Sequence, residues 1–339
     1  QVETVTSHNV IGRLAATAPA AERLPGAIVI GGHLDHLGYG GRGSFEPDRR
    51  EIHNGADDNA SGIAALLEAA RRLAAHAESE PATLRRDVLI VAFTGEELGL
   101  LGSTALLREP PAGFDADGLI AMLNLDMVGR LRDNRLAALG AGSSDAWSTI
   151  VPAACDGVRV GCTLGGDGFG PSDQTPFYAA GVPVLHLFSG THNLYHRPED
   201  DAYTINGAGL ARVAALTADL TRDLAARVEP PDHRQVAPPP PQGDSRSYGA
   251  SLGTIPDYAD GKPGVLLSGV RADGPAAQAG LRRGDRLVRL AGKAIGDIYD
   301  FMFVLRQHRP GDEAEAVIER GGEALTVPIT FGTARGMMR

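Results

Sequence analysis

Hydrophobic positions in the first two thirds of the chain alternate between strand-like and helix-like patterns. Between 61 and 77 the apolar residues lie three and four positions apart, which is helical spacing, and 209–228 closes the region as a second predicted helix. Apolar runs of strand length lie at 27–30, 88–93, 119–123 and 182–188, the last with Pro183 near its start and His186 within it. Such runs are typical of strands buried on both faces, and their alternation with helices predicts an α/β fold with a mostly parallel central sheet flanked by helices.

The last third of the chain has a different pattern. Its strands are short and glycines are frequent, which predicts a small β-rich domain with strands at 265–267, 286–290, 314–318 and 325–329, and helices at 276–279 and 298–306. A proline-rich stretch that includes Pro238–Pro241 separates the two patterns, and such a stretch cannot continue a helix. We therefore expect a domain at 1–228, a linker at 229–247 and a second domain at 248–335.

Composition excludes several classes of protein. Acidic residues number 42 against 32 basic ones, so the net charge of −10 and the lack of a basic stripe argue against a nucleic-acid partner. No apolar run approaches the ~18 residues of a membrane span. With two cysteines, any metal must be held by His, Asp and Glu. Cys155 and Cys162 are compatible with a short disulfide and equally with two reduced thiols.

Each predicted strand of the first region is followed by a histidine or a carboxylate. In an open parallel sheet, sites form beyond the carboxyl ends of the strands, and neighbouring strands lie only ~4.8 Å apart. We therefore expect one cluster that draws on His33, Asp35, His36, Asp57, Asp58, Glu96, Glu97, Asp126 and His196.

Such a cluster needs compensating positive charge, because buried like charges are costly and divalent cations neutralise them. Mixed His and carboxylate ligands suit zinc, with cobalt or manganese as substitutes. More than three carboxylates exceed one tetrahedral ion, so two ions ~3.5–4 Å apart fit better. Taken singly, Asp57–Asn59 could cap a helix and Glu96 with Glu97 could serve a helix dipole. Their joint occurrence at one sheet edge favours the metal interpretation.

Five ordered motifs between about residues 6 and 228 resemble the M28 family of dizinc metallopeptidases. They are His33-Leu34-Asp35, Gly55 to Gly62, Glu96 to Ser103, Asn124 to Met127 and Tyr195 to Pro198. The resemblance implies a zinc-aminopeptidase-like fold and an exopeptidase that acts on peptides or proteins, with removal of N-terminal residues as the favoured interpretation. The chain begins at Gln1 and shows no signal peptide, which fits either an intracellular protein or, as we favour, a fragment that lacks its leader and its first elements. An exported location, periplasmic, secreted or at the cell surface, is expected from that interpretation and from the habit of the family.

The resemblance also assigns roles to single residues. Asp58 corresponds to the carboxylate that bridges two zinc ions, and Glu96 to the general base. His33 and Asp126 would complete one ion, while Glu97 and His196 would complete the other. Spacing alone does not separate Glu96 from Glu97, or Asp58 from Asp57.

Two further residues take supporting roles by resemblance. Asp35 would orient His33, a task with a clear physical basis. Tyr195 matches a phenol that stabilises the oxyanion in some relatives, and a packed aromatic is the alternative. The remaining histidines near the site are interpreted as supporting or structural: His36, His53, His186 and His192. Gln174 and Leu194 depart from the residues common in the family, which affects pocket shape rather than ligands.

The second domain resembles a PDZ domain, most strongly at 274–285. Its carboxylate-binding loop would comprise Leu252, Gly253, Thr254 and Ile255, and its groove would lie between this strand and the helix at 298–306. Such domains capture a peptide C-terminus by strand addition. A domain that only packs, with an empty groove, is the other interpretation.

Two other functions compete with the peptidase. A glutaminyl cyclase has a similar site but uses one zinc ion, whereas this chain retains a dimetal set. A non-catalytic receptor or scaffold would keep the fold and bind through the PDZ domain. Proteins of that kind tend to lose ligands, and this sequence has lost none.

Overall fold

The computed structural model describes residues 6–234 and 250–332, except 42, 45, 47–48, 112–114, 167, 191, 193, 257–261, 271–273 and 297. The chain divides into two compact units, Gln1–Ala237 and Pro238–Arg339. Most of the expected linker lies outside the described residues. The domain boundaries at 228 and 248 stay predictions.

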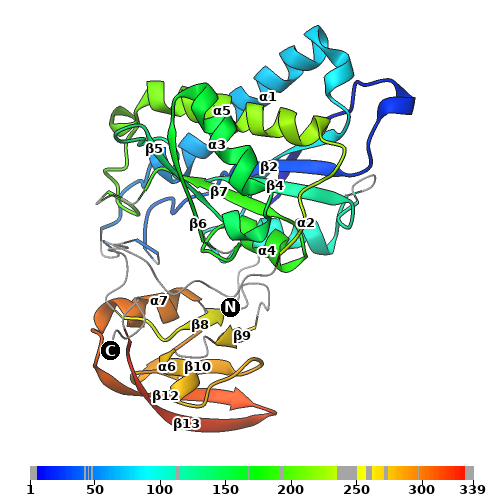
Figure 1. Ribbon diagram of the computed structural model, residues 1–339. Coiled ribbons are helices and arrows are strands. Elements are labelled where there is room, and N and C mark those ends of the chain that lie inside the picture. Colours follow the sequence, from blue (N-terminus) through cyan, green and yellow to red (C-terminus); the bar gives the residue numbers. More distant parts are fainter. Residues whose placement is uncertain are drawn as a thin grey trace. The chain divides into compact units, whose positions relative to one another are not determined.

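The first unit is built on a sheet whose described strands run in the order β1-β3-β2-β4-β7-β5-β6 (Figure 1). Strands β3, β2, β4 and β7 are parallel neighbours, while β1 and β5 run antiparallel to the strands beside them, β3 and β7. Their bounds are Val10–Leu14 (β1), Ala27–His33 (β2), Asp87–Phe93 (β3), Leu119–Leu125 (β4), Arg135–Leu139 (β5), Gly161–Gly165 (β6) and Val184–Phe188 (β7). The mostly parallel α/β fold predicted from the sequence is confirmed.

Helices cover both faces of this sheet (Figure 1). On one face lie α1 (Gly62–Ser79), α3 (Trp147–Val158) and α5 (Gly207–Ala226), and on the other lie α2 (Leu101–Arg108) and α4 (Gln174–Ala179). Short helical turns comprise η1 (Ala20–Glu22), η2 (Ala56–Ser61), η3 (Pro81–Thr83), η4 (Ala141–Ser143) and η5 (Ala202–Thr204).

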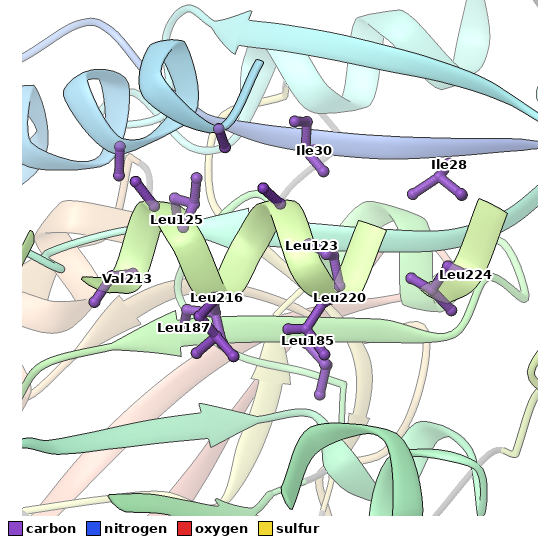
Figure 2. Close-up of a cluster of buried hydrophobic side chains, with 14 of the residues drawn as sticks. Ile28, Ile30, Leu123, Leu125, Leu185, Leu187, Val213, Leu216, Leu220 and Leu224 are labelled. Carbon is purple, nitrogen blue, oxygen red and sulfur yellow. The ribbon is translucent and has the colours of Figure 1, made fainter. Parts of the chain in front are cut away.

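The alternation of side chains along the strands produces two cores. Ile28 and Ile30 of β2 point to the face covered by α5, where they join leucines of β4 and β7 (Figure 2). Val29, between them, points to the opposite face and packs with Phe93 and Phe177. Burial on both faces explains why these strands appear as unbroken apolar runs.

Two differences from the predicted elements bear on the site. Strand β2 continues through two glycines to His33, so this histidine ends the strand instead of following it. Helix α1 begins at Gly62, and the residues before it form the separate turn η2. The Asp58–Asn59 peptide bond in this turn is cis.

The second unit contains an antiparallel β-sheet with described strands in the order β13-β12-β10-β9-β8, and β11 pairs with β10. The strands are Thr254–Pro256 (β8), Val265–Val270 (β9), Arg286–Leu290 (β10), Lys293–Ala294 (β11), Glu313–Arg320 (β12) and Glu323–Thr330 (β13). The helices are Pro275–Gln278 (α6) and Ile298–Gln307 (α7). This confirms the predicted β-rich domain.

Two further observations concern the cysteines and the helices. Cys155 of α3 and Cys162 of β6 form a disulfide. Among the helices that the structure describes, none has the length and apolar character that a membrane crossing requires.

Candidate metal centre

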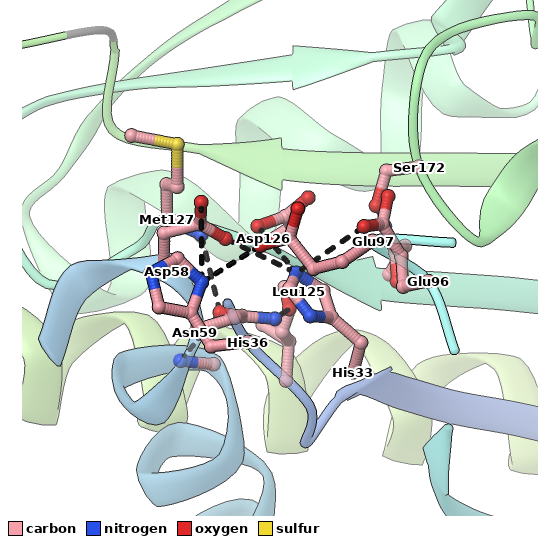
Figure 3. Close-up of polar contacts among 12 residues, drawn as sticks. His33, His36, Asp58, Asn59, Glu96, Glu97, Leu125, Asp126, Met127 and Ser172 are labelled. Carbon is pink, nitrogen blue, oxygen red and sulfur yellow. Dashed lines mark hydrogen bonds and ion pairs between the residues drawn. The ribbon is translucent and has the colours of Figure 1, made fainter. Parts of the chain in front are cut away.

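The predicted ligands meet at the carboxyl edge of the sheet in the first unit. Figure 3 shows four of them, His33, Asp58, Glu97 and Asp126. His33 is the last residue of β2, and its register partner Phe93 ends β3, so the two strands stop together. Asp126 follows β4 directly. The other three come from connecting segments: Asp58 from η2, Glu97 from the turn after β3, and His196 from the segment after β7. All five side chains are buried.

His33 faces two carboxylates. Its Nδ1 lies 3.1 Å from the carbonyl oxygen of Asp35, and a carbonyl can only accept, so Nδ1 carries a proton. Its Nε2 lies 3.3 Å from Oδ1 of Asp58 and 3.4 Å from Oδ1 of Asp126. This ring therefore presents its second nitrogen to a pair of negatively charged oxygens. We call these three side chains the His33 half of the centre.

His196 repeats the arrangement on the other side of Asp58. Its Nδ1 donates to the carbonyl oxygen of Gly43 at 2.8 Å. Its Nε2 lies 3.1 Å from Oδ2 of Asp58 and 3.2 Å from Oε2 of Glu97. Asp58 thus offers one oxygen to each histidine, as a bridging carboxylate does. We call His196, Glu97 and Asp58 the His196 half.

The carboxylates change the protonation of both rings. Burial lowers the pKa of His196, but Glu97 and Asp58 outweigh it and raise the pKa to about 10. Burial acts likewise on His33, where Glu96 and Asp126 raise the pKa well above its usual value. Without a cation, protons on these rings therefore balance the carboxylates. Metal binding would displace those protons, because a histidine ligand must be neutral.

The donor set fits divalent cations. Oδ2 of Asp58 and Oδ1 of Asp126 are buried, and each faces a histidine Nε2, that of His196 at 3.1 Å and that of His33 at 3.4 Å. Buried carboxylate oxygens need a partner, which a ring proton supplies without a metal and which a cation would supply in its place. Ligand atoms of His33, Asp58 and Asp126 lie within 4.8 Å of one another. Nitrogen and carboxylate donors at this spacing suit zinc.

Glu96 and Asp35 lie beside the His33 half. Oε2 of Glu96 is 4.0 Å from Nε2 of His33, and burial raises the pKa of Glu96 well above its usual value. The carboxylate of Asp35 accepts the backbone N–H groups of Glu96 and Glu97, at 3.1 and 3.3 Å. Its Oδ1 is 3.9 Å from Nδ1 of His33, so the hydrogen bond that orients His33 comes from the main-chain carbonyl of Asp35.

Asn59 fixes the Asp58 turn against the end of β4 (Figure 3). Its Nδ2 donates to the carbonyl of Leu125 at 2.9 Å, and its Oδ1 accepts the N–H of Met127 at 3.2 Å. These contacts lie on both sides of Asp126. Gly62 makes room for the amide, since a Cβ there would lie 2.3 Å from Oδ1 of Asn59. Sequence reasoning gave Asn59 no role of its own.

Asp200 holds the same turn from the other side. Its Oδ2 accepts the backbone N–H groups of Asp57 and Asp58, at 2.9 and 3.1 Å. Asp57 directs its Oδ1 to the N–H of Gly129 at 2.7 Å, and its Oδ2 lies 3.2 Å from Nε2 of His192. The two adjacent aspartates therefore face different partners. Asp200 was missed by the sequence reasoning; its only signal is its place four residues after His196.

The remaining candidates also have definite positions. The Tyr195 ring stacks on His196 with centroids 3.8 Å apart and planes inclined by 22°. Gln174 accepts from Nδ2 of Asn124 at 3.0 Å, behind the end of β4. In the second unit, Leu252 is buried and Thr254 begins β8.

Two more PDZ candidates complete the predicted loop. Gly253 has a φ of +66°, which favours glycine. Ile255 belongs to β8, and its side chain lies outside the described part of the structure.

Comparison with known proteins finds a matching family for each of the two units. Residues 9–221 match peptidase family M28, and residues 247–331 match the PDZ domain. The chain belongs to peptidase family M28. The second resemblance seen in the sequence, to a PDZ domain, is likewise confirmed.

Two curated relatives illustrate the similarity. The chain is 28% identical over 222 residues to aminopeptidase YwaD of Bacillus subtilis (strain 168), covering 62% of this chain and 43% of that protein. It is 26% identical over 367 residues to leupeptin-inactivating enzyme 1 of Streptomyces exfoliatus, covering 99% of this chain and 74% of that enzyme.

A solved structure of an aminopeptidase is also similar. The aminopeptidase from Aneurinibacillus sp. strain AM-1 matches with a TM-score of 0.52 and 26% identity, covering 70% of this chain and 52% of that one. The chain therefore spans about half the length of YwaD and of this aminopeptidase.

Proposed function

We propose that the chain is a dizinc exopeptidase that removes N-terminal residues from peptides or proteins. One observation carries the proposal: Asp58 offers its two oxygens to two different histidines, each accompanied by one more carboxylate. His33, Asp58 and Asp126 would hold one zinc ion, and Glu97, Asp58 and His196 the other. The names of the relatives, an aminopeptidase in Bacillus and another in Aneurinibacillus, support the same reaction.

The residues around the ligands suit peptide hydrolysis. Bound zinc supplies a water of lowered pKa and polarises a carbonyl group. Glu96 is the proposed general base: its Oε2 lies 4.0 Å from Nε2 of His33, beside the proposed ligands, and its raised pKa suits a group that takes a proton and returns it to the leaving amine. Asp35 holds the backbone of Glu96 in place.

Tyr195 is the proposed donor to the oxyanion. Its ring stacks on a proposed ligand, His196, so its position depends on the same segment of chain. Hydrogen-bond donors aimed at developing negative charge stabilise the transition state of acyl transfer.

The PDZ domain is proposed to dock the C-terminus of a substrate or partner at Leu252, Gly253, Thr254 and Ile255. Strand β8 pairs with β9 along one side and is the edge strand among the described strands of this sheet. Strand addition to such an edge is the usual mode of PDZ recognition. We also propose an exported location, which the Cys155–Cys162 disulfide supports because disulfides persist in oxidising compartments.

A peptide-library digest read by mass spectrometry tests the function. The zinc-loaded chain should shorten peptides from the N-terminus, chelator should stop the reaction, and added zinc should restore it. Shortening from the C-terminus, cleavage at internal bonds, or no hydrolysis at all by zinc-loaded protein would contradict the proposal. A glutaminyl cyclase would instead reveal itself by loss of ammonia or water from N-terminal Gln or Glu, with chain length unchanged.

A further inference from the structure

His36 is a partly buried histidine next to the His196 half, and the chemistry proposed above does not use it. Its side chain is 10% exposed, and its Nδ1 lies 2.7 Å from Oε1 of Glu97 (Figure 3). This is a short hydrogen bond between charged or polar groups, of the kind that fixes a side chain strongly.

The His36 ring has little freedom to turn. Gly55, at a φ of +56°, packs its backbone against the ring: a Cβ at this position would lie 2.6 Å from Cδ2 of His36. On another side the ring meets His196 edge-on, with centroids 5.7 Å apart and planes at 72°. The hydrogen bond to Glu97 therefore starts from a ring whose orientation is set by its surroundings.

This bond makes the two oxygens of Glu97 unequal. Oε1 accepts from His36, whereas Oε2 lies 3.2 Å from Nε2 of His196. An ionised carboxylate can only accept, so the proton resides on Nδ1 of His36. The oxygen left for a cation is Oε2, on the side that faces His196 and Asp58.

We propose that His36 is a positioning residue that makes Glu97 a one-oxygen ligand of the metal ion in the His196 half. The inference rests on the proposed dizinc function. A ligand bound through one oxygen leaves a coordination position that a two-oxygen ligand would occupy. Partners that hydrogen-bond to metal ligands orient them, and their loss typically costs ~10–100-fold in metal affinity or activity.

A competing role for His36 is direct metal binding. Its Nδ1 lies within 4.8 Å of oxygens of Asp58 and Glu97, so the three could surround an ion. That role needs a free lone pair on Nδ1, whereas the 2.7 Å contact with Glu97 requires a proton there. The two roles differ in what can replace the ring: asparagine can donate from the Nδ1 position, but phenylalanine cannot.

Zinc titration of the chelator-stripped full chain tests the inference, with a chromophoric chelator as competitor. Wild type should bind two ions. His36→Phe and His36→Ala should weaken one ion ~10–100-fold and leave the other unchanged. His36→Asn should lie within a few-fold of wild type. His76→Phe is the control, since His76 lies in the last turn of α1, away from the centre, and contacts Thr83 of η3.

The possible outcomes distinguish a failure of the positioning role of His36 from a failure of the proposed dizinc function. A wild type that binds one ion or none contradicts the dizinc function itself. With two ions in wild type, unchanged titration of His36→Phe and His36→Ala overturns the positioning role. So does His36→Asn binding as weakly as His36→Phe, because the ring nitrogen would then be a ligand. Equal weakening of both ions also overturns it, since the proposed effect is confined to one half.

Discussion

The two halves of the proposed metal centre are built in different ways. His33 and Asp126 stand at the ends of β2 and β4, two strands in the middle of the sheet, and β2 is paired along both sides. Glu97 and His196 stand in connecting segments, and His196 has a φ of +54°, which is uncommon for a residue with a side chain. Backbone pairing places the first half, whereas single side-chain and carbonyl contacts place the second.

This difference has consequences for stability. Elements paired on both sides open only with the whole fold, while loops held by a few bonds open at lower cost. The His196 half depends on Gly43, Asp200 and His36, each through one or two hydrogen bonds. We therefore expect its ion to bind more weakly and to leave first when chelator is added.

The largest effect is expected from Asp58→Asn, because this residue serves both halves. Replacing the carboxylate by an amide should release both ions and abolish hydrolysis. Loss of metal assistance is worth several kcal/mol, which corresponds to at least ~10³-fold in rate. Metal analysis and hydrolysis assays check this. The surface variant Asp219→Asn should behave as wild type, and retention of both ions by Asp58→Asn would refute the shared role.

Next in size is the contrast between the adjacent glutamates. Glu96→Gln should lower kcat by ~10²–10⁴-fold, as expected for a general base, while zinc content stays the same. Glu97→Gln should instead lose the ion of the His196 half. Zinc analysis beside kinetics distinguishes the two. If Glu96→Gln were the variant that loses zinc, the two roles would have to be exchanged.

The gathering of the proposed ligands at one sheet edge was predictable from the sequence, for a physical reason. Strand-end residues such as His33 and Asp126 follow apolar runs, and parallel strands bring such positions together. Asp200 was not predictable, because its acceptor role depends on contact with a turn more than 140 positions earlier. The bond between His36 and Glu97 likewise depends on how two loops meet. The pattern showed which residues gather, but not which hydrogen bonds hold them.

A smaller effect is expected from Asp200→Ala. Two buried N–H groups would lose their acceptor, which costs about 1–3 kcal/mol of unfolding free energy. Denaturant unfolding of the metal-free chain measures it. Asp200→Asn keeps an acceptor oxygen and should recover most of the loss. Equal stability of wild type and Asp200→Ala would show that this contact does not hold the Asp58 turn.

The smallest effect on the centre is expected from the PDZ unit. Burial raises the pKa of Asp285, but the Arg320 guanidinium at 2.7 Å and the Arg282 N–H outweigh it and lower the pKa. A lowered folded-state pKa stabilises the unit above the ordinary aspartate value of about 3.9, and this stability is lost as pH falls through the folded value.

Amide hydrogen exchange in β10 and β12 measures this dependence. Exchange should speed up as pH drops below about 3.9, relative to the intrinsic rate of an unprotected amide. Asp285→Asn should flatten the dependence and leave zinc content unchanged. An identical profile in wild type and variant would show that Asp285 does not cause the pH dependence of this unit's stability.

The number of zinc ions per chain tests the central claim most directly. Plasma emission of the zinc-loaded chain after exhaustive dialysis, referred to protein concentration by amino-acid analysis, should give two, and one when Glu97 or His196 is replaced by alanine. A wild-type value of one, unchanged by either substitution, would contradict the claim that Asp58 joins two metal-binding halves.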